Sequence, residues 1–155
     1  MTNTGFHYRA AVEWAGGRRT ILRFPDLPGV EVAPPPEFGG LGESWTPEGL
    51  YVGAVASCFL LTFIALAERS DFELASADVS AEGKLEKTAA GGYWLSQMTL
   101  RPMVVVESAK DVERAERLLN KAEQSCFVAA SIKSRVTVVA QVYHKQIPVS
   151  PCPAV

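Results

Sequence analysis

The feature that most constrains this chain is an uncharged run of nineteen residues, 49–67, which reads GLYVGAVASCFLLTFIALA. A run of this length is typical of a transmembrane helix or of a helix buried in a soluble core. Glycine, serine, cysteine and threonine dilute its hydrophobicity, and neither flank has the excess of positive charge that orients a membrane span. Strand-like segments lie on both sides. We therefore predict a buried central helix and no membrane.

The residues around this run predict an α+β fold. Pro47 suits the first turn of a helix, where its missing N–H costs nothing, and Ser44 or Thr46 could cap that helix. A second helix is expected from Ser108, which forms a possible capping box with Asp111 and is followed by an apolar stripe ending at Cys126. Alternating or apolar stretches predict strands over 6–13, 19–24, 73–87, 93–107 and 132–142, with an irregular loop over 25–43.

Length and charge limit the classes of function. A chain of 155 residues with 48% hydrophobic residues has room for one domain, expected over 1–143, followed by a proline-rich tail over 144–155. The net charge of −2 argues against nucleic-acid binding, which calls for a basic surplus. Three cysteines and an N-terminus without an apolar signal segment fit a reducing cytoplasm. The two histidines and scattered cysteines show no metal-ligand spacing.

Two cysteines are the candidates for chemistry, because Cys58 lies in the uncharged helix and Cys126 ends the stripe of the second helix. Free cysteine also packs as a small buried hydrophobe, so a purely structural role is the competing interpretation. Glu48 lies in the first helical turn, where its only role could be a favourable interaction with the helix dipole. Arg18, after the Gly-Gly turn, could be a solvated hairpin residue. Spacing alone does not decide between these interpretations.

Two motifs resemble a known family. The segments WTPEGL over 45–50 and AVASCF over 54–59 resemble the core signature of the osmotically inducible and organic hydroperoxide resistance proteins, the OsmC/Ohr family. The segment AEQSC over 122–126, before the last strand, resembles the second signature of that family. The resemblance spans roughly residues 8–142. It implies a two-layer α+β fold and an intertwined homodimer with a buried central cysteine helix and with active sites at the interface.

The resemblance also implies an activity. Cys58 would be the peroxidatic cysteine of an organic hydroperoxide reductase, and Cys126 would resolve its sulfenic acid as a disulfide. Arg18, with Arg19 as the adjacent alternative, would stabilise the thiolate, and Glu48 would hold the guanidinium. The family needs no bound cofactor, and an external dithiol of the lipoyl type would reduce the disulfide.

The chain departs from the family pattern near the second cysteine. Phe127 stands where the family commonly has proline, and Ala129 replaces a frequent serine, so the turn that places Cys126 differs. Cys152 in the tail is either an accidental surface thiol or a rival resolving residue. Two other functions stay open. The first is a redox-inactive stress protein of the same fold that binds a small molecule or lipid. The second is a hydrolase, for which Glu48 is the candidate base.

Overall fold

The structure is a computed structural model, and it describes residues 5–145. Helices and strands are mixed along the chain, which confirms the predicted α+β class. The chain forms two compact units, Met1–Tyr51 and Val52–Val155, and each is described by itself. The expected tail over 144–155 falls almost wholly outside the described residues, as does Cys152.

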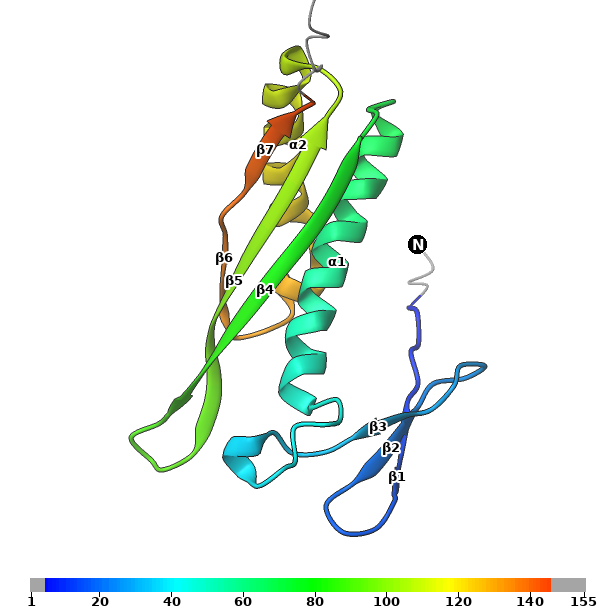
Figure 1. The fold of residues 1–155 in the computed structure, drawn as a ribbon, viewed down its shortest axis with the longest axis vertical. Helices are drawn as coiled ribbons and strands as arrows, with labels where there is room; N and C mark the ends of the chain where they lie inside the picture. The colour runs from blue at the N-terminus through cyan, green and yellow to red at the C-terminus, as the bar shows by residue number, and fades with distance from the viewer. Residues whose placement is uncertain (1–4, 146–155) are drawn as a thin grey trace, which may run out of the picture. The chain divides into compact units, whose positions relative to one another are not determined.

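The N-terminal unit is a small antiparallel sheet followed by a loop. Its strands β1 (Ala11–Trp14), β2 (Thr20–Arg23) and β3 (Val30–Val32) pair in the order β1-β2-β3, so β1 and β3 are edge strands (Figure 1). Gly16 and Gly17 make the β1–β2 turn with positive φ angles of 91° and 56°, which glycine adopts without a Cβ penalty. A short 3₁₀ helix, η1 (Pro36–Phe38), follows β3.

Two details of this unit differ from the sequence prediction. The first strand begins at Ala11 rather than at residue 6. The proline-rich stretch over 25–43, expected to be irregular, contains β3 and η1, because short edge strands and 3₁₀ turns leave little periodicity in a sequence. The predicted cap of the long helix is confirmed at Thr46, whose hydroxyl Oγ1 accepts the Gly49 N–H at 3.0 Å.

The C-terminal unit contains a long antiparallel hairpin extended by two parallel strands. Strands β4 (Ser76–Lys87) and β5 (Tyr93–Val106) form the hairpin expected from alternation. The single last strand predicted over 132–142 is in fact two strands, β6 (Arg135–Val138) and β7 (Gln141–His144). Both pair in parallel with β5, one after the other along its length (Figure 1). Pairing with the same neighbour explains why the two strands look continuous in sequence.

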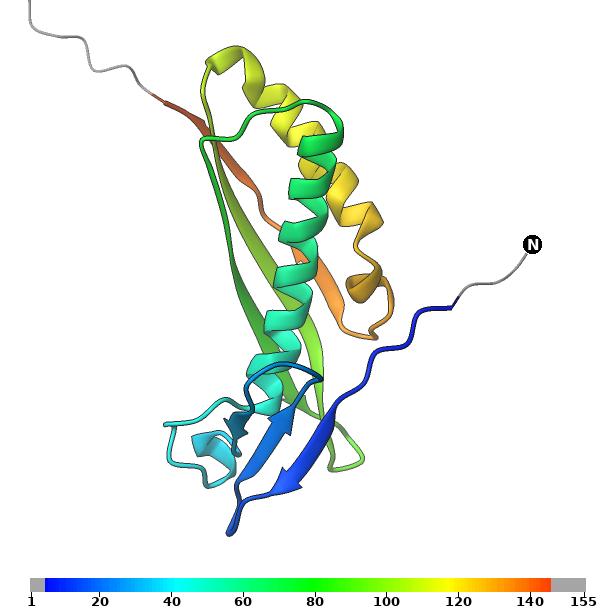
Figure 2. The same ribbon diagram turned by 90° about the vertical axis from the view of Figure 1, so that its right-hand side faces the viewer.

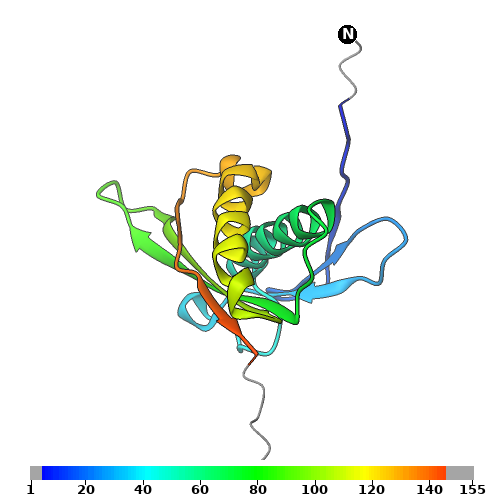
Figure 3. The ribbon, with the colours of Figure 1, turned by 90° about the horizontal axis from the view of Figure 1, so that it is seen from above.

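The helices of this unit lie on one face of the sheet, as Figures 2 and 3 show. They are α1 (Pro47–Arg69), whose residues 47–51 belong to the N-terminal unit, α2 (Val112–Ser125) and the short α3 (Phe127–Ala130). The predicted capping box is wrong: Ser108 precedes a 3₁₀ turn, η2 (Ala109–Asp111), without a side-chain cap hydrogen bond, and α2 begins only at Val112. Cys126 separates α2 from α3 in an extended conformation.

The core of the C-terminal unit lies between the helices and the sheet. Its completely buried side chains include Phe63 of α1, Leu100 of β5 and Leu119 of α2. Helix α1, predicted to be buried, has one fully buried stripe in the single chain, formed by Val55, Phe59, Phe63 and Ala67. By length and composition it could cross a membrane, with a mean hydropathy of 2.2, and 28% of its most apolar segment is buried.

Candidate active site

The two candidate cysteines come together in the C-terminal unit. Cys58 lies on α1 and is half-buried, whereas Cys126, between α2 and α3, is buried, and both are free thiols. Their side chains interact directly through a thiol–thiol hydrogen bond. Thr62 donates its hydroxyl to the Cys58 carbonyl at 2.7 Å, which satisfies the threonine within α1. The fold therefore places a partly accessible thiol beside an enclosed one.

The environment of Cys126 favours its protonated form. Burial raises the pKa of the Cys126 thiol above its ordinary value of 9.0, because a buried thiolate loses its hydration. The backbone N–H groups of Ala129 and Val128 act in the opposite direction, while the hydrogen bond to Cys58 and the negative charge of its thiolate raise the pKa further. The enclosed Cys126 thiol is therefore harder to ionise than an ordinary cysteine, and Cys58 is the more accessible of the two, so the two thiols have different roles available to them.

A groove of about 840 Å³ runs beside Cys58 between α1 and the α2–α3 segment. Phe127 and Leu61 line it, and their side chains are 69% and 65% exposed. The position where the family commonly has proline thus presents an aromatic ring to the groove that contains Cys58. On the inner side, Cys126 also borders a smaller cavity of about 210 Å³ together with Phe59 and Leu100.

Arg18 and Glu48 lie together in the N-terminal unit. Both line a cavity of about 330 Å³ beside Phe38. The Arg18 guanidinium donates from Nη1 to the Phe38 carbonyl at 2.5 Å. The Glu48 atom Oε2 is buried and has no hydrogen-bond partner among the described residues. The expected ion pair between Arg18 and Glu48 is therefore not formed in this structure, although the two residues share one cavity.

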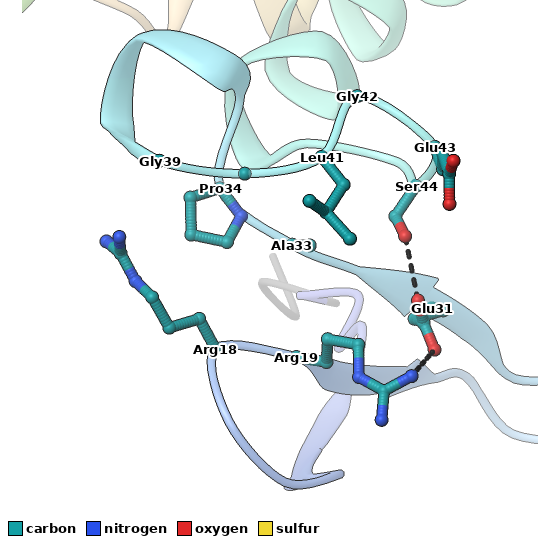
Figure 4. A pocket seen from close by; sticks show the side chains of 11 residues that line it. Arg18, Arg19, Glu31, Ala33, Pro34, Gly39, Leu41, Gly42, Glu43 and Ser44 are labelled. Carbon is teal, nitrogen blue, oxygen red and sulfur yellow. Dashed lines mark hydrogen bonds and ion pairs between the residues drawn. The ribbon is translucent and has the colours of Figure 1, made fainter.

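Arg19, the alternative to Arg18, has another partner. Its Nη1 lies 3.6 Å from Oε2 of Glu31, and Ser44 donates its hydroxyl to Oε1 of Glu31 at 2.7 Å. Figure 4 shows this network on one side of a second cavity, of about 430 Å³, which Arg18 also lines with its side chain directed away from Arg19 and Glu31. Because Arg19 pairs with Glu31 while Arg18 shares a cavity with Glu48, the geometry favours Arg18 of the two arginines.

The structure thus brings the predicted residues together two by two. In the C-terminal unit Cys58 lies against Cys126, and in the N-terminal unit Arg18 and Glu48 line one cavity. An approach of Arg18 to Cys58 stays a prediction. Within residues 5–145, no cluster of three or more histidine, cysteine or acidic side chains could hold a metal ion.

Sequence reasoning missed two cations that line the groove of Cys58, Arg69 and Lys121. Lys121 lies outside the apolar stripe of the second helix, where a charged side chain on the solvent side is expected. The helical periodicity of α1 carried a signal for Arg69, which lies eleven residues, close to three turns, after Cys58.

Comparisons with known proteins agree with this fold. Residues 40–141 match the model of the OsmC-like protein family. An uncharacterised protein of Bacillus subtilis, YmaD, is 30% identical over 135 residues, which cover 84% of this chain and 89% of YmaD. An OsmC-like protein of unknown function from Vibrio cholerae has a TM-score of 0.78 at 22% identity, covering 89% of this chain and 99% of the other. An organic hydroperoxide resistance protein from Elizabethkingia anophelis has a TM-score of 0.74 at 20% identity, with coverages of 93% and 100%.

Proposed function

This chain belongs to the family of OsmC-like proteins, and from that premise we propose that it is a thiol-dependent peroxidase that reduces organic hydroperoxides in the cytoplasm. The observation that carries the proposal is the hydrogen bond between a groove-lining Cys58 and a buried Cys126, whose pKa is raised by burial. The family includes hydroperoxide-reducing proteins, and one structural neighbour is named as an organic hydroperoxide resistance protein. A two-cysteine peroxidase needs this arrangement, with one accessible sulfur that meets the peroxide and one enclosed sulfur that resolves the sulfenic acid.

The reaction proceeds in three balanced steps. The Cys58 thiolate attacks the distal peroxide oxygen, the O–O bond breaks, and the leaving alkoxide takes a proton to become an alcohol, which leaves Cys58 as a sulfenic acid. The Cys126 thiol condenses with this sulfenic acid, which releases water and forms a Cys58–Cys126 disulfide. An external dithiol, of the lipoyl type, then transfers two electrons and two protons, restores both thiols and becomes a disulfide itself. No bound cofactor takes part.

Arg18 and Glu48 serve this reaction by supporting the anion. An arginine within a few ångströms favours a thiolate, and a carboxylate offsets the cost of burying the guanidinium while fixing its orientation. Within residues 5–145, one buried oxygen of Glu48 has no hydrogen-bond partner, and an unsatisfied buried carboxylate oxygen is costly. Moving the Arg18 guanidinium from the Phe38 carbonyl to Glu48 would satisfy that oxygen. In the proposed active state Arg18 bonds Glu48 and faces Cys58.

The proposal includes a homodimer. Within 5–51, Val32 is the one apolar side chain that is buried, so this unit has almost no core of its own. Its first segment presents an exposed alternating stripe of Phe6, Tyr8, Val12 and Trp14, with Tyr8 90% and Trp14 78% exposed. An apolar stripe along the β1 edge strand needs a cover, and a second copy of the chain supplies it. Sedimentation equilibrium of wild type and Val12→Glu tests this, since the charge should favour the monomer.

The chemical test is disulfide mapping after one equivalent of cumene hydroperoxide. Reduced protein should lose two hydrogens by intact mass and acquire a Cys58–Cys126 link, and Cys126→Ser should trap Cys58 as a sulfenic acid that dimedone labels. A link from Cys58 to Cys152 would keep the reaction but replace the resolving residue. A protein that stays reduced while a control peroxidase is oxidised would overturn the proposal and favour the redox-inactive binding protein.

A further inference from the structure

The small cavity on the inner side of Cys126 connects this thiol with a carboxylate. The cavity measures about 210 Å³ and lies among α1, β5, β6 and the α2–α3 segment. Among the residues that the structure describes, Cys126 and Glu123 are the titratable side chains in its lining. The other lining residues are Phe59, Leu100, Ala129, Ala130, Val136 and Val138. A buried thiol therefore shares an otherwise apolar cavity with a single acidic group.

Helical spacing brings these two groups within reach of each other. Glu123 precedes Cys126 by three residues at the end of α2, and side chains three apart on a helix have Cβ atoms about 5–6 Å from each other. Glu123 is exposed, whereas Cys126 is 2% exposed. Glu123 forms no ion pair within residues 5–145. Its carboxylate can therefore accept a proton on the cavity side and release it to solvent.

The resolving step requires a proton acceptor. Cys126 must react as a thiolate, because the thiolate rather than the thiol is the nucleophile. Burial, together with the neighbouring Cys58, raises the pKa of Cys126, so little thiolate is present near pH 7. The charged residues of the adjacent groove, Arg69 and Lys121, do not line this cavity. Glu123 is therefore the acid–base group that the fold places beside the Cys126 sulfur.

We propose that Glu123 accepts the proton of Cys126 when Cys126 resolves the sulfenic acid of Cys58. The carboxylate takes the thiol proton, directly or through a water molecule for which the cavity has room, as the Cys126 sulfur attacks the Cys58 sulfur. The S–S bond forms with the electron pair of Cys126. The S–O bond of Cys58 breaks, and the leaving hydroxide takes a proton from solvent to become water.

Glu123 then returns its proton to solvent, so the step needs no further reactant. This role rests on the proposed peroxidase function, because the sulfenic acid must form before it can be resolved. It also makes a prediction that the peroxidase function alone does not make. Glu123 should matter for formation of the disulfide and not for the first oxidation of Cys58.

Rapid-quench kinetics separates these two steps. Reduced protein is mixed with cumene hydroperoxide and quenched in acid, and intact mass distinguishes the sulfenic acid, which has gained one oxygen, from the disulfide, which has lost two hydrogens. Glu123→Gln keeps the shape of the side chain and removes its charge. This variant should oxidise Cys58 at the wild-type rate but form the disulfide about tenfold or more slowly at pH 7, so that the sulfenic acid accumulates.

The pH profile distinguishes proton transfer from a structural effect. In Glu123→Gln, disulfide formation should accelerate about tenfold per pH unit between pH 6 and pH 9, because it follows the thiolate fraction of Cys126, whose pKa lies above 9.0. Wild type should depend much less on pH in this range, since a carboxylate acceptor is available throughout it. The two rates should converge as the pH rises further.

Two further variants serve as controls. Glu123→Asp retains a carboxylate on a shorter side chain, so its rate of disulfide formation should lie between those of wild type and Glu123→Gln. Glu116→Gln removes an exposed acidic charge seven residues, about two turns, earlier in α2 and outside the cavity. It should form the disulfide at the wild-type rate and with the wild-type pH profile.

Two results would overturn the role of Glu123 and leave the peroxidase standing. One is a Glu123→Gln variant with the wild-type rate and pH profile of disulfide formation. The other is a loss of rate by the same factor at every pH, which would mean that the substitution only disturbs the α2–α3 segment. A wild type in which Cys58 stays reduced, under conditions that oxidise a control peroxidase, would overturn the peroxidase function and the role of Glu123 with it.

Discussion

The two units of this protein divide stability and chemistry between them. The C-terminal unit has a core that includes Phe63, Leu100 and Leu119, and it contains both interacting thiols. Among its described residues, 5–51, the N-terminal unit has a single buried apolar side chain, Val32, but it carries Arg18 and Glu48, the groups proposed to activate the thiol. Since about 25 cal/mol accompanies each square ångström of buried apolar surface, the C-terminal unit must supply most of the stability of a single chain.

The largest expected effect contrasts one aromatic side chain in each unit. Phe63→Ala should lower the free energy of unfolding by about 3–5 kcal/mol, because it removes a fully buried ring and leaves a cavity. Trp14→Ala should cost below about 1 kcal/mol in dilute protein, since its ring is 78% exposed. Urea unfolding followed by circular dichroism measures both. Equal losses of stability at low protein concentration would contradict the comparison. A loss of stability in Trp14→Ala that grows with protein concentration would instead place Trp14 at the interface with the second copy.

The prediction of the fold from the sequence was incomplete for a physical reason. The uncharged run and Pro47 predicted α1 correctly, and alternation predicted β4 and β5, because both patterns are local. The parallel pairing of β6 and β7 with β5 depends on contacts between distant residues, so the sequence showed one strand. In the same way, neither spacing nor composition brought Cys58 to Cys126; that expectation came from family resemblance.

The second prediction concerns chemistry located in the weakly packed unit. Arg18→Ala should lower the rate of hydroperoxide reduction by about tenfold or more, because an adjacent guanidinium favours the thiolate. Its free energy of unfolding should change little, since the side chain is exposed at its hydrogen bond to the Phe38 carbonyl. Stopped-flow oxidation of the reduced protein measures the rate.

Arg19→Ala is the matched control for Arg18→Ala, because Arg19 pairs with Glu31 instead. It should retain most of the rate. A larger loss of rate for Arg19→Ala than for Arg18→Ala would make Arg19 the residue that stabilises the thiolate. Unchanged rates in both variants would mean that neither arginine takes part in the mechanism.

A third, smaller effect is expected where α1 begins. Thr46→Ala removes the hydroxyl that accepts the Gly49 N–H and should cost about 1 kcal/mol of stability. Thr46→Ser keeps the acceptor and should restore most of it. Ser44, the other predicted cap, instead donates to Glu31, so Ser44→Ala should not reproduce the loss of the helix cap. Amide hydrogen exchange in the first turn of α1 distinguishes these variants, with faster exchange of the Gly49 amide expected for Thr46→Ala alone.

The last expected effect is a pH dependence that belongs to the C-terminal unit, because residues 1–51 contain no cysteine. Burial raises the pKa of the Cys126 thiol above 9.0 in the folded state. A group whose pKa is raised on folding stabilises the protein fully below its unfolded pKa, and that contribution is lost as the pH rises toward the folded pKa. Stability should therefore fall above pH 9, by at most about 1.4 kcal/mol per pH unit from this group.

Urea unfolding of reduced protein at pH 8 and pH 10 isolates this contribution when wild type is compared with Cys126→Ala. The cavity left by Cys126→Ala lowers the free energy of unfolding equally at both pH values. The variant should nevertheless lose less stability between pH 8 and pH 10 than wild type does. An identical fall in both would mean that the buried thiol is not what links pH to folding, and it would remove the physical reason for keeping Cys126 protonated as the resolving residue.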